Sequence, residues 1–254
     1  MTTQPTGAAG KAPMKTLLAP FEKRFITWLT PYFPKWIETW HLTLLTIPWC
    51  VGLIVFGWLA GRTGNLHWLW LSSLMIFLQW FTDAFDGAIG RYKDTGLIKW
   101  GFYMDHLLDY VFLCSTLIGY ALLTEGTNRE IILYLIPVFG GYMTASFLGF
   151  GATGEFKITY LATGPTEIRT WFIVLNTALI LLGTHWILPL LPWLLGVSVL
   201  LLCFISFRTQ KYLWIWISNK SIEPTKRINF GYLDNILFDN TPYFNIVHIR
   251  IVYM

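Results

Sequence analysis

Apolar residues along this chain gather in six long stretches that are separated by polar segments. A helix needs about 20 predominantly apolar residues to cross the hydrocarbon layer of a bilayer, which is roughly 30 Å thick. The pattern therefore predicts an all-α, polytopic membrane protein with six transmembrane helices. The first, fourth and sixth stretches carry no charge, the fifth is shorter and extends back toward Thr166, and the second and third contain aspartates. The stretches are Leu42–Leu59, Leu69 to about Gly90, about Gly101 to Leu123, Ile131–Phe150, Thr170–Gly183 and Trp186–Phe207.

The composition of the 254 residues supports this prediction, because 55% are hydrophobic, 18% are aromatic and 13% are charged. A soluble domain carries about 25% charged residues, so a disordered chain, a coiled coil and a nucleic-acid-binding protein are all disfavoured. The net charge of +4 is too small to indicate a polyanionic partner. Cys50, Cys114 and Cys203 lie in apolar stretches, so we expect small buried side chains and no disulfide framework.

Basic residues are distributed unevenly between the two sides of the predicted helices. Sixteen Lys and Arg residues lie in the segments on one side, whereas Arg62 and Arg129 lie on the other. Cytoplasmic loops are enriched in Lys and Arg, so the larger group marks the cytoplasmic side. The pattern predicts a multi-pass integral membrane protein with both termini in the cytoplasm, in the inner or plasma membrane if the source is prokaryotic.

The segments that flank the predicted helices differ in character. Residues 1–16 are rich in Gly, Thr, Ala and Pro, and we expect them to be disordered. In residues 17–40, aromatic and apolar residues recur at near-helical spacing among basic ones, which is typical of an amphipathic helix at the membrane interface. An irregular linker is the alternative, because Pro20, Pro31 and Pro34 would interrupt a long helix. Residues 41–210 then form the six-helix membrane domain, and residues 211–254 form a cytoplasmic tail without an assigned role.

Four aspartates are concentrated where the second predicted helix ends and the third begins. Asp83 and Asp86 are three residues apart and Asp105 and Asp109 are four apart, so each pair shares one helix face. An isolated acidic pair would more often be a solvated helix cap. Carboxylates at membrane depth, however, cost several kcal/mol unless they are paired or bound to a cation, and they mark a functional site by default. Divalent metal held by hard oxygen ligands is the simplest compensation, and two Mg²⁺ or Mn²⁺ ions about 4 Å apart would clamp a diphosphate.

Three glycines and an arginine accompany these aspartates. Gly87 and Gly90 lie beside the first pair and Gly101 precedes the second, so both helices lack side chains where a backbone or a flat ligand must approach. Arg91 offers a bidentate donor to phosphate oxygens. A phosphoryl-transfer site needs metal ions on the diphosphate, an arginine near the developing charge and a carboxylate that acts as general base. This segment offers residues for all three.

The segment from Asp83 to Asp109 resembles the CDP-alcohol phosphotransferase signature, which is D-x-x-D-G-x-x-A-R followed after eight or nine residues by G-x-x-x-D-x-x-x-D. Every defined position matches except one, where Gly90 replaces the alanine. This change leaves the metal site untouched, although it is expected to loosen helix packing. The resemblance extends over the six spans, the cytoplasmic site and the interfacial helix, roughly residues 20–210, but it does not include the tail.

The resemblance implies an enzyme of phospholipid biosynthesis, commonly a homodimer, that releases CMP from a CDP-linked donor by attack of an alcohol hydroxyl. It implies a CDP-linked donor, an alcohol or diacylglycerol acceptor and membrane lipids as partners, and no nucleic acid. The roles implied at the matching positions are metal binding (two Mg²⁺ or Mn²⁺) for Asp83, Asp86, Asp105 and Asp109, general base for Asp109, and nucleotide binding for Asp83, Gly87, Gly90, Arg91 and Gly101.

Three further residues bear on which alcohol is used. His106 follows Asp105 as in the D-H-x-x-D of the choline and ethanolamine phosphotransferase branch, where the histidine is a candidate base. A packing or interfacial histidine is the alternative, because position i+1 points about 100° away from Asp105. The turn from Gly164 to Glu167 also resembles that branch, although Glu167 is equally a favourable acid at a helix start. Arg169 either binds an anionic head group or follows the positive-inside bias.

Several functions therefore compete. A choline- or ethanolamine-phosphotransferase-like enzyme is weakly favoured over a CDP-diacylglycerol-dependent phosphatidyltransferase acting on serine, inositol or glycerol phosphate, since both would use the same metal site. A membrane prenyltransferase is disfavoured, because those sites use differently spaced acidic motifs on helices further apart. A cation transporter would need ionisable groups near mid-membrane in several spans, whereas these aspartates lie at one edge.

Overall fold

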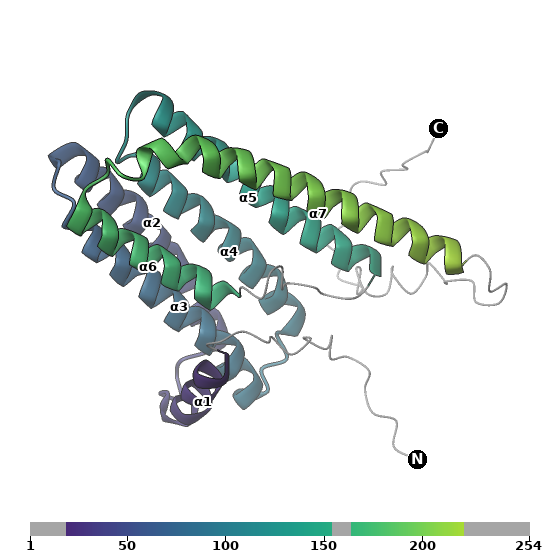
Figure 1. The fold of residues 1–254 in the computed structure, drawn as a ribbon. Helices are drawn as coiled ribbons and strands as arrows, with labels where there is room; N and C mark the ends of the chain where they lie inside the picture. Colours follow the sequence, from purple (N-terminus) through teal and green to yellow (C-terminus); the bar gives the residue numbers. More distant parts are fainter. Residues whose placement is uncertain (1–18, 154–163, 221–254) are drawn as a thin grey trace, which may run out of the picture. The chain divides into compact units, whose positions relative to one another are not determined.

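The computed structural model describes residues 19–153 and 164–220, and every regular element in these two ranges is helical (Figure 1). The all-α class is therefore confirmed. The predicted disordered segment 1–16 and most of the predicted tail lie outside the described residues. The helices are α1 (Ala19–Leu29), α2 (Thr39–Thr63), α3 (Trp68–Lys93), α4 (Ile98–Ala121), α5 (Gly126–Thr153), α6 (Pro165–Leu182) and α7 (Leu191–Lys220), with short 3₁₀ helices η1 (Thr30–Tyr32) and η2 (Leu188–Leu190).

Each of the six predicted stretches forms a helix, from α2 to α7. Within the described ranges, three segments are long and apolar enough to cross a membrane, namely α2, Gly126–Ala152 of α5, and Leu188–Ile215, which contains most of α7. The aspartates interrupt the apolar character of α3 and α4, and α6 has only 18 residues. Membrane crossing by α3, α4 and α6 therefore stays a prediction.

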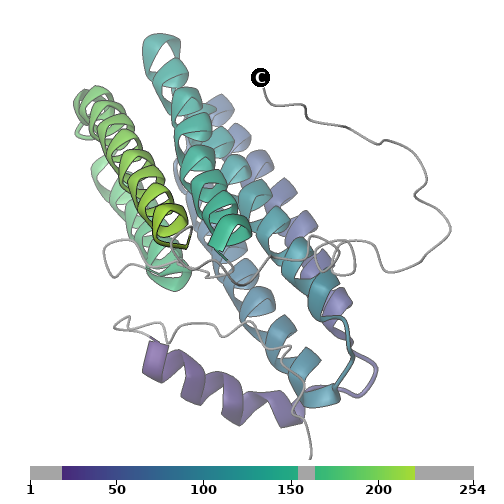
Figure 2. The same cartoon turned by 90° about the vertical axis from the view of Figure 1, so that its right-hand side faces the viewer.

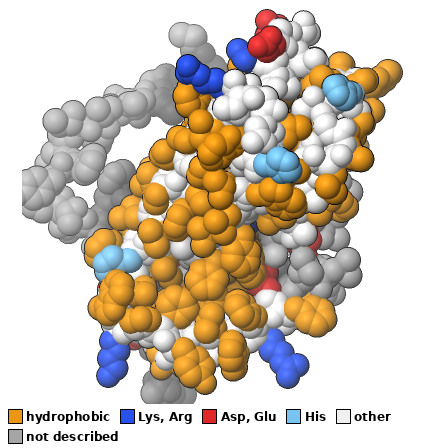
Figure 3. Space-filling view, turned by 90° about the vertical axis from the view of Figure 1, so that its left-hand side faces the viewer, with side chains coloured by type: hydrophobic (Ala, Val, Ile, Leu, Met, Phe, Trp, Pro, Cys, Tyr) orange, Lys and Arg blue, Asp and Glu red, His pale blue; other side chains and the backbone are white. Residues whose placement is uncertain are grey.

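The apolar surface of the helices is extensive. Figure 3 shows hydrophobic side chains over most of one face, with Lys and Arg near its two ends. On α7, Trp193 is 75% exposed and Leu200 is 70% exposed. Exposed apolar surface of this extent is found where a protein contacts a membrane or a partner. The last predicted span starts later than expected, because Leu188–Leu190 is a 3₁₀ helix and α7 begins only at Leu191. Pro189 and Pro192 explain this start, since proline is accepted in the first turn of a helix but not in its interior.

α2 packs along both α3 and α4 and so forms the centre of the bundle. A Cβ atom at Gly57 of α2 would lie 2.6 Å from the Cα of Gly119 on α4, so the two backbones are in direct contact. Small residues permit this close approach, which is a common way of joining helices in membranes. α6 packs against α3. The side chain of Asn176 on α6 also forms hydrogen bonds to Tyr120 of α4 and Ser73 of α3. The buried Asn176 accepts a 2.8 Å hydrogen bond from the Tyr120 hydroxyl and donates one of 3.0 Å to Ser73 Oγ.

α1 lies across the end of the long helices, as Figure 2 shows. Ile26 and Leu29 of α1 pack against a buried cluster that contains Phe85 and Ile89 of α3. Its other face leaves Phe21 76% exposed and Trp28 62% exposed. The helical part of the predicted interfacial segment is shorter than expected, because α1 ends at Leu29 and the chain is irregular beyond η1. Pro31 and Pro34 follow the end of the helix, whereas Pro20 lies in its first turn, and contact of α1 with the membrane interface stays a prediction.

The chain divides into two compact units, Met1–Leu213 and Trp214–Met254. The first contains α1 to α6 and most of α7. Of the second, the structure describes the end of α7, Trp214–Lys220. In the first unit, α5 and α7 are joined by a 2.7 Å hydrogen bond from the Tyr142 hydroxyl to the Ser198 carbonyl. The three cysteines are free thiols, as predicted, but the expected burial holds only for Cys50, because Cys114 is partly buried and Cys203 is exposed on the apolar surface.

Candidate metal centre

A short turn brings the four aspartates to the same end of the bundle. Asp94 ends α3 in the left-handed conformation with φ 50°, and its amide donates to the Gly90 carbonyl. Gly96 follows with φ 70°, a conformation that glycine adopts without steric cost. The chain therefore reverses between Lys93 and Ile98, and the last turns of α3 face the first turns of α4.

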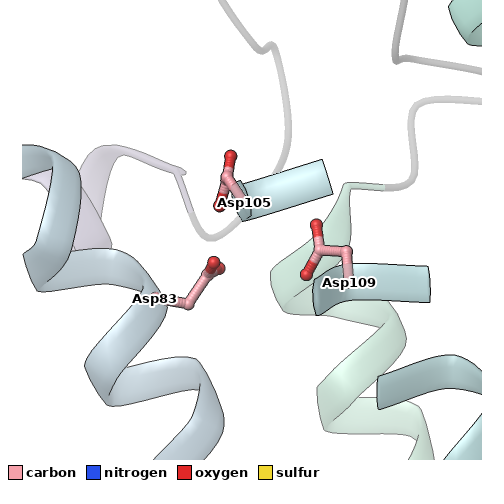
Figure 4. Close-up of side chains that lie close together, drawn as sticks. All are labelled: Asp83, Asp105 and Asp109. Carbon is pink, nitrogen blue, oxygen red and sulfur yellow. The ribbon is translucent and has the colours of Figure 1, made fainter. Parts of the chain in front are cut away.

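Three of the predicted metal ligands converge in this region. Asp83, Asp105 and Asp109 each offer a carboxylate oxygen, and these atoms all lie within 4.8 Å of one another. Figure 4 shows the three carboxylates, which we call the acidic triad, pointing toward a common space. All three residues are partly buried, so their mutual repulsion is screened less than at an exposed surface. Carboxylate oxygens are the ligands that Mg²⁺ and Mn²⁺ prefer, and the acidic triad is able to bind a divalent metal.

Asp86, the fourth predicted ligand, makes a different contact. Its carboxylate is buried beside α2, where Oδ2 accepts a 2.9 Å hydrogen bond from the Thr43 hydroxyl. The Thr39 carbonyl lies 3.1 Å from the same hydroxyl and is its alternative acceptor. Thr43 therefore holds the orientation of a predicted metal ligand, although it is on another helix.

Arg169 is a buried cation that pairs with two members of the acidic triad. Its Nη2 lies 2.9 Å from Asp83 Oδ2 and 2.8 Å from Asp109 Oδ1, and its side chain is 5% exposed. The guanidinium carbon lies 5.6 Å from the ring centroid of Phe112 on α4, a cation–π arrangement. The positive-inside interpretation of Arg169 does not account for this burial, because the side chain lies inside the bundle and not among exposed loop residues.

The His106 ring packs against aromatic side chains beside the acidic triad. Its Nδ1 lies 2.6 Å from the Phe102 carbonyl, which can only accept, so Nδ1 carries the proton. The ring packs against Phe102 at 4.2 Å and edge-on against Phe147 at 5.0 Å, as measured between centroids. The distance from Nδ1 to Asp105 Oδ2 is 3.8 Å. These contacts favour a packing role for His106, although they do not engage its Nε2 atom.

The glycines of the signature do not share one environment. A Cβ atom at Gly90 would lie 2.9 Å from Thr39 Oγ1, so this glycine permits close approach of α2. A Cβ atom at Gly87 would lie 3.3 Å from Nη1 of Arg91, which is itself exposed. At Gly101, no heavy atom of the described residues lies within 4 Å of the corresponding position. Gly101 thus leaves space on α4 next to the acidic triad.

Glu167 acts at the start of α6. Its Oε2 accepts a 3.1 Å hydrogen bond from the Gly164 amide, which is the contact expected of an acid in the first helical turn. The neighbouring Thr166 hydroxyl donates a 2.9 Å hydrogen bond to Glu22 of α1. The start of α6 is therefore fixed to α1, the helix that crosses the end of the bundle. This contact positions Arg169, which lies two residues after Glu167.

Two functional contacts could not have been found from sequence. Thr43 lies in an apolar stretch where threonine commonly bonds to its own helix, Thr39 precedes that stretch, and neither has motif spacing to the aspartates. The bridge from Arg169 to Asp83 joins residues far apart in the chain. The position of a polar residue inside an apolar run is the one signal that the sequence offered for Thr43, and it offered none for Thr39.

Comparison with known proteins identifies a family for this chain. A sequence model of the family described as CDP-alcohol phosphatidyltransferase matches residues 40–207, well over half of the chain. The matched range contains the four aspartates, the signature glycines and Arg169. No curated protein and no solved structure matches the chain.

Proposed function

The chain belongs to the CDP-alcohol phosphatidyltransferase family, and from this premise we propose that it transfers a phospho-amino-alcohol from a CDP-linked donor to the hydroxyl of diacylglycerol. Membership makes it an integral membrane enzyme of phospholipid synthesis, with several apolar helices, that uses a CDP-alcohol donor and an alcohol acceptor and releases CMP. The observation that carries the proposal is the convergence of the three carboxylates of the acidic triad, two of which contact Arg169.

We assign the divalent cations to Asp83, Asp86, Asp105 and Asp109, as two Mg²⁺ or Mn²⁺ ions. When bound, such cations neutralise the diphosphate and stabilise charge on the leaving phosphate. The protein itself holds the carboxylates in place through Thr43 at Asp86 and through Arg169 at Asp83 and Asp109. The Thr43 contact at Asp86 reduces the reorganisation that the site needs when a charged substrate arrives.

Asp109 is our candidate for the general base. It would accept the proton of the attacking hydroxyl while that oxygen bonds to the β-phosphorus, and the bond from this phosphorus to the CMP oxygen would break. Asp109 is a member of the acidic triad on α4 and is 29% exposed, which leaves it accessible to a substrate. His106 is the second candidate, through Nε2, because its Nδ1 is engaged by the Phe102 carbonyl.

The nucleotide is assigned to the space between the ends of α3 and α4. Gly87 and Gly101 lack side chains, Arg91 is an exposed donor for phosphate oxygens, and Asp83 is the α3 member of the acidic triad. Gly90 serves the same region indirectly by admitting Thr39. Glu167 and Arg169, at the start of α6, are assigned to the acceptor or its head group.

The branch and the topology are part of the proposal. The D-H-x-x-D sequence and the Gly164–Glu167 turn favour a choline- or ethanolamine-type donor over CDP-diacylglycerol with serine, inositol or glycerol phosphate. Six membrane-spanning helices, α2 to α7, would place both termini and the metal centre in the cytoplasm. We further propose a homodimer, as is common in the family, in the inner or plasma membrane if the source is prokaryotic.

The test is CMP release by the purified full-length protein in detergent with Mn²⁺. CDP-choline or CDP-ethanolamine is offered with diacylglycerol, and CDP-diacylglycerol is offered separately with serine, inositol or glycerol phosphate. Metal-dependent CMP release with the first group would support the proposed branch, whereas release with the second group alone would refute the branch and keep the family activity. Absence of CMP from every pair would refute the proposed substrates.

A further inference from the structure

Arg169 contacts two members of the acidic triad through a single nitrogen atom. Nη2 is 2.9 Å from Asp83 Oδ2 and 2.8 Å from Asp109 Oδ1, so it lies between a carboxylate of α3 and a carboxylate of α4. The side chain is 5% exposed and its guanidinium carbon lies over the Phe112 ring. Arg169 is therefore a buried cation in the position that bridges two of the proposed metal ligands.

A divalent cation and this guanidinium cannot both occupy that bridging position. Mg²⁺ takes its oxygen ligands at about 2.0–2.1 Å, whereas the nitrogen already lies at hydrogen-bond distance from the same two oxygens. Positive charges this close together repel strongly where water is largely excluded. The four aspartates nevertheless carry more negative charge than one guanidinium neutralises, so the site keeps an attraction for further cations.

The same contacts explain how the site persists without metal. Three carboxylates within 4.8 Å of one another repel, and an uncompensated charge in a partly buried site is strongly destabilising. The bridge from α6 offsets this repulsion and fixes the ends of α3 and α4 relative to each other.

We propose that Arg169 is the built-in counter-ion of the acidic triad: it pairs with Asp83 and Asp109 in the metal-free enzyme and gives up these contacts when a divalent cation binds the triad. The proposal rests on the metal site assigned above. It makes Arg169 a positioning residue whose competition with the cation sets the metal affinity. A guanidinium that remained in place and only oriented the carboxylates would have the opposite effect, since losing such a partner weakens metal binding by about 10–100-fold.

The experiment measures Mn²⁺ affinity of the purified full-length protein in detergent, by electron paramagnetic resonance of free Mn²⁺. Arg169→Gln should bind Mn²⁺ about tenfold or more tightly than the wild type, because it removes a positive charge within a few ångströms of the cation. Arg169→Lys should fall between the two, because a lysine keeps the charge but lacks the planar guanidinium fork.

Thermal unfolding supplies a second measurement that does not depend on activity. Arg169→Gln should unfold at a lower temperature than the wild type in EDTA and should regain most of this loss in saturating Mn²⁺. Arg62→Gln is the matched control, because Arg62 is exposed near the other end of α2 with its guanidinium 5.1 Å from the Trp58 ring centroid. This control should match the wild type in Mn²⁺ affinity and in both unfolding experiments.

Mn²⁺ binding by Arg169→Gln that is equal to or weaker than that of the wild type would overturn the proposal. Metal-dependent CMP release by the wild type would then leave the proposed function standing. Failure of the wild type and of both Arg169 variants to bind Mn²⁺ would overturn the metal site and this proposal together.

Discussion

The hydroxyl group of Thr43 on α2 donates a 2.9 Å hydrogen bond to Oδ2 of Asp86 on α3, and both side chains are buried. Partners of this kind fix the orientation of a metal-binding carboxylate, and their loss typically costs 10–100-fold in affinity or activity. The contact makes α2 part of the proposed site, although α2 contributes none of the aspartates.

Thr43→Val should lower Mn²⁺-dependent CMP release about tenfold with little effect on folding, because valine keeps the shape and removes the donor. The measurement is the rate as a function of Mn²⁺ concentration. Thr116→Val is the matched control, since the Thr116 hydroxyl is also buried but bonds to the Phe112 carbonyl of its own helix. Equal rates for Thr43→Val and the wild type would show that the contact has no role in the site.

Restoring the alanine of the signature should be unfavourable in this chain. Gly90→Ala would place a methyl group 2.9 Å from Thr39 Oγ1, and overpacking of this kind costs about 1–3 kcal/mol of unfolding free energy. The double variant Gly90→Ala with Thr39→Ala should recover most of the loss. Unfolding midpoints of the two single variants and the double variant measure this coupling, and a fully stable Gly90→Ala would contradict it.

Asp105→Asn and Asp109→Asn should each abolish CMP release while the protein stays folded, because each substitution removes charge with little change in volume. The expected loss is at least about a hundredfold for Asp109 if it is the base. Asp94→Asn is the control, since Asp94 lies in the nearby turn at φ 50°, a conformation that asparagine also adopts. Retained activity in both triad variants would refute the assignment of the metal centre.

His106→Gln separates the two candidate bases. If Asp109 accepts the proton, this substitution should reduce the rate by less than about tenfold, well short of the loss expected for a general base, and should leave the pH dependence of the rate unchanged. A hundredfold loss together with a shifted pH profile would instead assign the base to His106.

The polar contacts of Asn176 predict a stability effect away from the site. Asn176→Leu removes the partner of the Tyr120 hydroxyl and of Ser73, so it should lower the free energy of unfolding by about 1–3 kcal/mol. Tyr120→Phe should cost less, and the double variant should show coupling between the two residues. CMP release per folded molecule should not change, because Tyr120 lies eleven residues beyond Asp109 on α4, about 16 Å along the helix axis.

Local features of the sequence predicted much of this architecture. Hydrophobic stretches of spanning length located α2 to α7, and the three- and four-residue spacings placed the aspartate pairs on helix faces. Of the three prolines expected to interrupt a long helix, Pro31 and Pro34 follow its end at Leu29, whereas Pro20 is accepted in the first turn of α1. All of these depend on residues that are neighbours in the chain, whose relative positions the geometry of a helix fixes.

The packing of separate helices decides instead which of these side chains meet. It brings Asp83 together with Asp105 and Asp109, and it places Arg169 between Asp83 and Asp109. The sequence presented Arg169 either as a ligand for an anionic head group or as one basic residue among those on the cytoplasmic side, and Thr43 as a polar residue in an apolar run. Tertiary structure made one of them the counter-ion of the acidic triad and the other the partner of Asp86, because the close contact of α2 with its neighbours and the packing of α6 against α3 determine which side chains meet. The helices and the aspartates were therefore determined by the sequence itself, whereas the partners of the aspartates were decided by contacts between helices distant in the chain, which local spacing does not encode.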